Sequence, residues 1–511
     1  MSNRKLNSAR NALFGLLLKF YQIIMPFVMR TIMIKSMGIE YAGINNLFIS
    51  ILQVLSLAEL GIGAALIFSM YKPLANGDTE KVNALMNLYK KTFRVLGIII
   101  LGIGIIIFPF IPKFISGEIP GELNIYILYF MYLINTSLSY FLFAYKSSLL
   151  YATQRVDISN KIMIATSTVQ YILQIISIII YHNYYFYIIS SIVYQLMTNL
   201  ITAYIVKKKY PQYKPKGEVS KELKYDIKKR VIGLITNKIG GTLLNSTDTI
   251  IISSMFGLTT LGVYQNYYYI ITSIISIAGI LFYSCLASIG NSIITESEEK
   301  NYKNFLTFNF IISYISIVCC SLLIAIYQDF IKLWVGEKYT LDYGFIFLIV
   351  VFFYIYQIEQ LIGTYKDAAG IWYEDRFRSL ITGIINLILS FLLGKIIGLN
   401  GVKLATILSM ILCSTPWLII NLFKYIFKES NKKLFCFELL KTTFLWAIIS
   451  IITYIICNNI MYVGIKGIII KGIISIIMSN ILLLIFFYRS EYKKNTINII
   501  KNILKLKEIE W

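Results

Sequence analysis

Residues 207–230 read KKKYPQYKPKGEVSKELKYDIKKR, and this hydrophilic stretch is the only long polar break in a largely apolar sequence. Ten of its 24 residues are Lys or Arg, and basic clusters at both ends lie directly against apolar segments. Under the positive-inside rule, a cytoplasmic loop between two transmembrane helices has this composition. We therefore expect the stretch to divide the protein into two membrane-embedded halves.

The composition predicts an all-α membrane protein. At 511 residues, 57% hydrophobic and 14% charged, the chain has too little polar surface to cover a soluble globule of its size. Runs such as 98–108 are apolar on every face, which excludes the alternating pattern of a transmembrane β-barrel. About 14 stretches are long enough to cross the hydrocarbon core as helices. They are residues 13–34, 44–70, 95–112, 125–145, 162–181, 186–206, 231–255, 262–290, 305–327, 343–365, 379–396, 402–423, 442–460 and 467–488.

The net charge of +22 needs no nucleic-acid partner. With the N-terminus inside, 37 of the 48 Lys and Arg residues fall on cytoplasmic segments, as the positive-inside rule requires. This asymmetry predicts a multi-pass protein of the cell membrane with both termini cytoplasmic, and it makes anionic membrane lipids the expected partner of the basic loops.

The pattern of the first half restarts after the polar stretch. The segment GLTTLGV at 257–263 follows GIEYAGI at 38–44 by 219 residues, with both glycines in register. The predicted inner loops at 146–161 and 366–378 are separated by a similar interval. We interpret this as a weak repeat of six helices, whose two bundles are related by an axis along the membrane normal. The predicted parts are an N-lobe at 1–206, a cytoplasmic linker at 207–230, a C-lobe at 231–424, two accessory helices within 425–488 and a basic cytoplasmic tail at 489–511.

One face of the first predicted helix is polar. Lys19, Gln22, Pro26 and Arg30 share it at about 100° per residue. Pro26 removes a backbone hydrogen bond inside the helix and is expected to kink it. A kinked helix with one polar face is typical of a cavity lining. Snorkelling of Lys19 and Arg30 to the two headgroup layers is the alternative interpretation.

The seventh helix mirrors this arrangement with Lys238, Asn245 and Asp248 on one face. Ionisable groups inside the membrane are costly, and a shared aqueous cavity would accommodate them. Asp248 is a candidate proton or sodium site, or alternatively a polar residue at the outer end of its helix. Glu59 and Glu359 lie toward inner helix ends, where interfacial or structural roles compete with ion coupling.

The sequence contains no signature of a resident cofactor. It has no Walker A glycine loop and no His/Cys cluster with metal-ligand spacing, and His182 stands alone in a predicted outer turn. We expect no cofactor beyond a coupling proton or sodium ion, and no nucleotide hydrolysis.

Several motifs carry a family resemblance. Arg30-Thr-Ile, Gly38-Ile-Glu-Tyr-Ala-Gly, Leu55-Ser-Leu-Ala-Glu-Leu-Gly-Ile-Gly, Tyr71-Lys-Pro-Leu-Ala and Ala84-Leu-Met-Asn-Leu-Tyr-Lys-Lys resemble bacterial polysaccharide flippases of the multidrug/oligosaccharidyl-lipid/polysaccharide exporter superfamily. The resemblance covers the whole chain in helix count and repeat, and its specific motifs lie mainly in the first 94 residues and around Asn245-Ser-Thr-Asp248. It implies two six-helix lobes forming a V plus a C-terminal helix pair.

The resemblance also implies a function. Such a flippase moves a polyprenyl-pyrophosphate-linked oligosaccharide from the inner to the outer leaflet by alternating access, for surface (capsule-type) polysaccharide of the cell envelope. The pyrophosphate would bind Arg30, Lys19 and Lys238, and other polysaccharide-assembly proteins are candidate partners. This chain departs from the lipid II flippases in having fewer cavity arginines.

Two rival functions stay open. A cation-coupled small-molecule antiporter of the multidrug branch shares the twelve-helix core, but favours an acidic cavity and lacks the extra helix pair. A membrane glycan polymerase would need a large outer loop or clustered acid and base residues, and the sequence offers neither.

Overall fold

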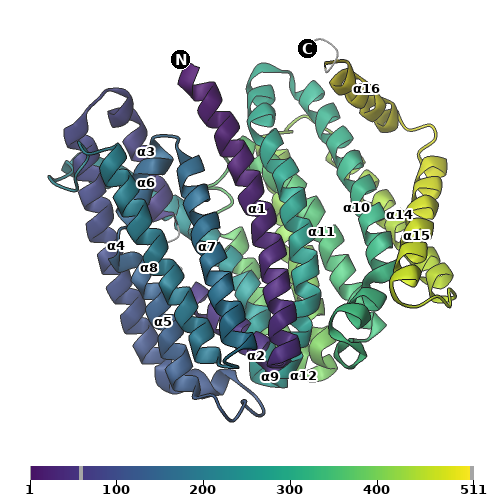
Figure 1. Cartoon of the computed structure of the whole chain (residues 1–511). Coiled ribbons are helices and arrows are strands. Elements are labelled where there is room, and N and C mark those ends of the chain that lie inside the picture. Colours follow the sequence, from purple (N-terminus) through teal and green to yellow (C-terminus); the bar gives the residue numbers. More distant parts are fainter. Residues whose placement is uncertain (1, 57–60, 507–511) are drawn as a thin grey trace. The chain divides into compact units, whose positions relative to one another are not determined.

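The computed structural model describes residues 2–56 and 61–506, and every regular element within these ranges is helical (Figure 1). A few further side chains, among them those of Lys238 and Asn245, lie outside the described residues. The expectation of an all-α protein is confirmed. The N-terminal helices are α1 (Ser2–Ser36), α2 (Ile39–Leu55), α3 (Ile62–Ala75), α4 (Thr79–Ile107), α5 (Ile125–Phe141), α6 (Ala144–Ala152), α7 (Val156–Ile179) and α8 (Tyr184–Lys209). The others are α9 (Lys221–Thr295), α10 (Glu298–Val335), α11 (Tyr343–Ala368), α12 (Arg378–Ser409), α13 (Thr415–Tyr425), α14 (Lys432–Asn458), α15 (Gly464–Phe486) and α16 (Glu491–Leu506).

Ten helical segments in the described ranges are long and apolar enough to cross a membrane. Two of these segments, 239–295 and 378–425, are double-length and each contains two of the predicted spans. The pair α5 and α6, bent by 54°, is an eleventh candidate if the two helices form one span, and the shorter apolar helices α2 and α3 overlap the predicted second span. The chain is therefore a multi-pass membrane protein, and the number of fourteen spans stays a prediction.

Glycines with positive φ make the predicted outer turns shorter than expected. Gly38 (φ 119°) separates α1 from α2, so the second helix begins at Ile39 rather than near 44. Gly257 (φ 85°, ψ 176°) kinks α9 without a loop, and Gly398 (φ 64°) does the same inside α12. Only glycine adopts these angles without strain, so one residue breaks a helix where the sequence suggested a turn of several.

The chain divides into two compact units, 1–265 and 266–511. In the first unit, α1 packs on α7, α7 on α8, and α4 on α5, around a core that contains Phe48, Tyr129 and Tyr184. In the second, α10 contacts α11, α14 and α15. The boundary falls within α9, whereas the lobes drawn from the sequence assign residues 221–230 of this helix to the linker and the rest to the C-lobe. Those lobes stay a prediction.

The part of the predicted linker between α8 and α9, residues 210–220, is irregular and lies against α4, whereas residues 221–230 form the beginning of α9. The backbone N–H of Lys214 donates to Asn83 Oδ1 at 2.6 Å, and Asn87 Nδ2 donates to the Gly217 carbonyl at 2.8 Å. Asn83 and Asn87 are one helical turn apart on α4, so they present consecutive side chains to the linker. The first part of the linker is thus fixed to the N-terminal unit.

The two copies of the glycine motif contact each other. A Cβ atom at Gly43 would collide with the carbonyl of Leu258, and one at Gly262 would collide with that of Ile39. Leu258 and Ile39 are 219 positions apart, as are Gly262 and Gly43. Equivalent residues therefore exchange equivalent contacts, as in a local two-fold arrangement of the start of α2 and the part of α9 after its kink.

Candidate functional site

Arg30 lies on α1 and is half-buried, and its Nη2 donates a hydrogen bond of 2.9 Å to the backbone carbonyl of Gly262. We call the place where Gly43 and Gly262 each pack against the backbone of the other motif copy the glycine crossing. The contact with Gly262 fixes the guanidinium there. A guanidinium has five N–H donors, so it can hold a backbone oxygen and an anion at once. Of the other residues on the predicted polar face, Lys19 is partly exposed and Gln22 is exposed.

Pro26 lies inside α1, which is continuous from Ser2 to Ser36. The kink expected at this residue stays a prediction, as do the substrate-binding roles of Lys19 and Gln22.

Asp248 is buried in α9, with 4% of its surface exposed. The hydroxyl of Tyr264 donates to Asp248 Oδ2 at 3.0 Å. Two residues before Tyr264, the carbonyl of Gly262 accepts the hydrogen bond of Arg30. Asp248 thus lies before the Gly257 kink, and Gly262, whose carbonyl binds Arg30, lies after it. The other predicted members of this site, Lys238, Asn245 and Glu59, lie outside the described residues or side chains.

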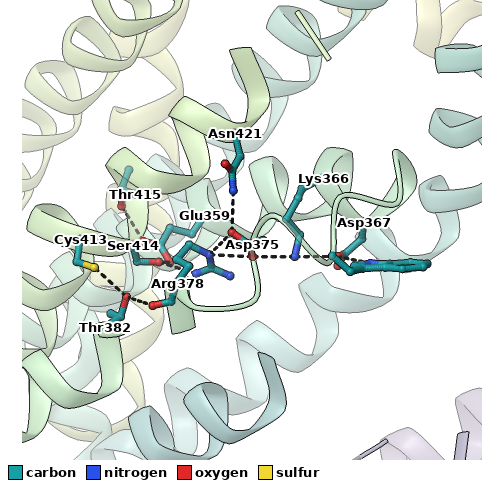
Figure 2. A network of polar contacts seen from close by, with 11 residues as sticks. Glu359, Lys366, Asp367, Asp375, Arg378, Thr382, Cys413, Ser414, Thr415 and Asn421 are labelled. Atoms are coloured by element: carbon teal, nitrogen blue, oxygen red, sulfur yellow. Dashed lines mark hydrogen bonds and ion pairs between the residues drawn. The ribbon is translucent and has the colours of Figure 1, made fainter. Parts of the chain in front are cut away.

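Glu359 lies on α11 and accepts two hydroxyl hydrogen bonds (Figure 2). Ser414 Oγ donates to Oε2 at 2.9 Å, and Thr415 Oγ1 donates to Oε1 at 2.7 Å. Ser414 closes a π-helical segment, Met410–Ser414, between α12 and α13. Such π-bulges are rare and occur frequently at functional sites. The bulge turns two consecutive hydroxyl groups toward one carboxylate.

The network continues from Ser414 to a buried cluster of charges. Arg378 Nη1 donates to Ser414 Oγ at 2.7 Å, and its Nε lies 2.9 Å from Asp375 Oδ1. Asp375 is fully buried and also accepts from Lys366 Nζ at 3.1 Å and from Asn421 Nδ2 at 3.1 Å. Figure 2 shows these side chains converging from α11, α12, α13 and the α11–α12 loop. We call Asp375, Arg378 and Lys366 the C-terminal clamp.

An equivalent group, the N-terminal clamp, consists of Asp157, Arg155 and Lys161. Arg155 Nε and Nη2 donate to the two carboxylate oxygens of Asp157 at 2.9 and 3.1 Å, and Lys161 Nζ lies 3.9 Å from Oδ2. Asp157 is fully buried, and its backbone N–H donates to Asn11 of α1 at 2.8 Å. A bidentate Arg–carboxylate pair is the strongest form of this contact. Each clamp fastens the ends of several helices together.

Sequence reasoning missed both clamps, although a signal was available. Asp157 and Asp375 are 218 residues apart, inside the two predicted inner loops that had been aligned as repeats. The preceding helices also end alike: Gln154 (φ 59°) and Gly370 (φ 73°) adopt the left-handed conformation. In each copy, the backbone N–H of the next residue donates to the carbonyl five residues earlier, as in a Schellman motif. These bonds run from Arg155 to Leu150 and from Ile371 to Lys366. The shared acid in each loop could have identified the pair.

Lys403 is a second residue that sequence reasoning passed over, because it lies at the beginning of a predicted span. Its side chain is almost completely buried in the C-terminal unit, with Nζ 3.8 Å from the centre of the Phe352 ring and 5.0 Å from that of Tyr268. Aromatic faces attract a cation by their quadrupole. Within the described residues, no group of three His, Cys, Asp or Glu side chains is arranged to hold a metal ion.

Comparisons with known proteins identify one matching sequence family and one fold shared with solved structures. The sequence model of a family described as polysaccharide biosynthesis protein matches residues 8–286. The structure of the lipid II flippase MurJ in an inward closed conformation is similar, with a TM-score of 0.64 and 17% identity, over 93% of this chain and 99% of that one.

Multidrug transporters share the fold as well. An inward-facing multidrug resistance MATE family transporter of the MOP superfamily has a TM-score of 0.64 and 13% identity, over 81% of this chain and 99% of that one. An outward-facing transporter of the same family has a TM-score of 0.55 and 16% identity, over 83% and 96%. No curated protein sequence matches this chain.

Proposed function

The chain belongs to the family of polysaccharide biosynthesis proteins, and from this premise we propose that it is a flippase for a lipid-linked oligosaccharide. It would carry a polyprenyl-pyrophosphate-linked glycan from the inner to the outer leaflet of a bacterial plasma membrane, with both termini in the cytoplasm. The family match over 8–286 carries the proposal. The fold shared with a lipid II flippase over 93% of the chain supports it.

The proposed anion site is built around Arg30. Its side chain is half-buried and held at the glycine crossing by Gly262, so the cation is positioned before substrate arrives. A bidentate guanidinium suits a pyrophosphate better than a point charge does. Lys19 and Lys238 are proposed to add positive charge, and Gln22 and Asn245 to hydrogen-bond the glycan.

The proposed ion-coupling sites are Asp248, Glu359 and Glu59. Asp248 and Glu359 each accept hydroxyl hydrogen bonds, from Tyr264 and from Ser414 and Thr415 respectively. Protonation of a carboxylate oxygen that accepts one of these bonds would require that hydroxyl partner to reorient, because a protonated oxygen becomes a donor. Binding of a proton or sodium ion would thereby bias two conformations of an alternating-access cycle.

A cation-coupled small-molecule antiporter is the second candidate function. The observation that favours it is the likeness to a multidrug transporter, whose TM-score of 0.64 equals that of the lipid II flippase. The multidrug transporter aligns with 81% of this chain, whereas the flippase aligns with 93%. The additional coverage supports the flippase.

The test is leaflet location of a fluorescent polyprenyl-pyrophosphate oligosaccharide in reconstituted vesicles. Addition of a quencher that cannot cross the bilayer reports the outer-leaflet fraction over time. We expect the intact protein to speed exchange under an imposed gradient, Arg30→Ala to abolish the increase, and Arg30→Lys to restore part of it. Thermal unfolding of each variant controls for folding. If the intact protein moves no such lipid but exports small cationic drugs, the antiporter function is favoured instead.

A further inference from the structure

The loop between α11 and α12 presents three large aromatic side chains to its surroundings. Trp372, Tyr373 and Phe377 are 50%, 65% and 46% exposed. The guanidinium of Arg376 stacks over the ring of Tyr373, 3.5 Å from its centre, and lies 4.8 Å from that of Phe377. We call these four residues the aromatic patch. Exposed aromatic rings in contiguous positions mark an interaction surface.

A clamp can form without residues equivalent to Trp372 and Tyr373. In the first unit, two residues separate the left-handed Gln154 from the clamp residue Asp157, whereas four residues separate Gly370 from Asp375. The second loop is therefore two residues longer, and the additional length carries the tryptophan and tyrosine. The N-terminal clamp forms without any aromatic residue at these positions. The two added aromatic side chains are thus not needed to form a clamp.

The loop holds the patch rigidly. Trp372 Nε1 donates to Asp367 Oδ1 at 3.1 Å, and Asp367 also pairs with Lys366 at 2.9 Å. Lys366 is in turn part of the C-terminal clamp, through Asp375 at 3.1 Å (Figure 2). The polar edge of the indole is therefore satisfied by the protein, which leaves the apolar part of the ring half exposed. This arrangement suits a partly apolar environment.

The position of the patch identifies that environment. One candidate membrane span ends at Ala368 and the next begins at Arg378, so the loop lies at the boundary of the membrane. Amphipathic aromatic rings concentrate at the headgroup level of a bilayer. Residues 366–378 contain three basic and three acidic side chains, so their charges cancel. Attraction of the loop to anionic lipid is therefore weak, and the aromatic rings supply the driving force.

We propose that the aromatic patch is a membrane anchor, in which Trp372, Tyr373 and Phe377 insert into the headgroup layer of the adjacent leaflet. Arg376, stacked on Tyr373, lies where its guanidinium meets phospholipid phosphates of that layer. Because the C-terminal clamp joins α11, α12 and α13, an anchored loop holds the ends of these three helices at the membrane surface. The partner is the phospholipid surface itself, and the anchor is independent of which substrate the protein carries.

Tryptophan fluorescence in lipid vesicles tests the proposal. A variant with Trp372 as its only tryptophan is obtained by replacing Trp334, Trp417, Trp446 and Trp511 with Phe. We expect its emission to be quenched about twofold more by phospholipid brominated near the headgroup than by phospholipid brominated near the chain end, as for a ring at headgroup depth. Because the loop charges cancel, quenching in phosphatidylcholine and in phosphatidylglycerol vesicles should be similar.

Two controls keep the test decisive. If the single-tryptophan variant does not fold, the difference between the wild type and Trp372→Phe reports the same side chain. A variant that retains only Trp446, which is 5% exposed, reports a ring enclosed by protein. Emission of Trp372 that is quenched by iodide but not by brominated lipid would overturn the proposal. Protection of Trp372 from iodide by a soluble oligosaccharide would instead identify a glycan surface, and would also overturn it.

Discussion

Thr259 donates a hydrogen bond of 2.9 Å to the carboxylate of Glu40, although these residues occupy equivalent positions of the two repeats, 219 residues apart. Two residues related by a two-fold axis meet in this way only close to the axis. The reciprocal contacts of Gly43 with Leu258 and of Gly262 with Ile39 surround the same point. The two copies of the glycine motif therefore serve as one another's packing partner, and Arg30 is fastened to the same crossing through Gly262.

This crossing should be detectable by chemical cross-linking. In a cysteine-free background, the pair Glu40→Cys and Thr259→Cys should react with a short bifunctional thiol reagent. Protease cleavage at a site engineered into 210–220 would then leave the two fragments joined on a denaturing gel. Each single-cysteine variant is the control and should release separate fragments. Failure of the double variant to retain the fragments would contradict the crossing.

Substitution of Gly262 tests the closeness of the two helices. Gly262→Val places side-chain atoms against the backbone of Ile39, which cannot yield as a flexible side chain can. Overpacking of this kind costs about 1–3 kcal/mol, so we expect a clear drop in the thermal unfolding temperature of the detergent-solubilised protein. Gly102→Val in α4 is the matched control, because a Cβ there meets nothing within 4 Å. Equal effects of the two changes would show that helix propensity, and not packing, is responsible.

Neutralising Asp375 should destabilise the C-terminal unit strongly. Asp375→Asn removes the buried carboxylate charge that lies 3.1 Å from Lys366 and 2.9 Å from Arg378, whose side chains are only 7% and 14% exposed. Removing one partner of a buried ion pair costs about 3–5 kcal/mol. Asp367→Asn is the matched control, since this carboxylate is 47% exposed and solvent screens its charge, so we expect a smaller loss. Thermal unfolding of the two variants measures the difference, and a similar loss in both would refute the buried role of Asp375.

The helices were predictable from the sequence because each apolar run is long enough to cross the hydrocarbon core. The repeat was visible in the paired glycines of 38–44 and 257–263. The clamps were missed, because Asp157 and Asp375 lie in predicted inner loops, where an acidic residue is normally solvated. Their burial depends on Asn11 in one unit and Asn421 in the other, both remote in sequence. The hydroxyl partners of Glu359 depend in the same way on a π-helical segment that periodicity does not reveal.

The accessory helices should depend on one ion pair. Lys471 of α15 lies 2.6 Å from Asp329 of α10, and both side chains are largely buried. A hydrogen bond between charged groups contributes about 1.5–3 kcal/mol, so Lys471→Met should loosen α15 and expose its loop to limited proteolysis. Asp329→Asn should have a similar effect, and the exchange of the two residues should restore part of the protection. Additive effects of the two single changes would indicate that the residues act independently.

Glu359→Gln separates the structural role of this residue from ion coupling. An amide keeps an acceptor oxygen for Ser414 or Thr415, which donate to Glu359 at 2.9 and 2.7 Å, but it cannot take up a proton. If Glu359 couples transport to an ion, the variant should unfold within a few degrees of the wild type and yet lose the acceleration of lipid exchange by an imposed gradient. Glu359→Ala, which removes both acceptors and leaves two hydroxyl groups without them, is the comparison for structural damage. Retention of gradient-driven exchange by the Gln variant would exclude Glu359 as the coupling site and leave Asp248 as the principal candidate in the described residues.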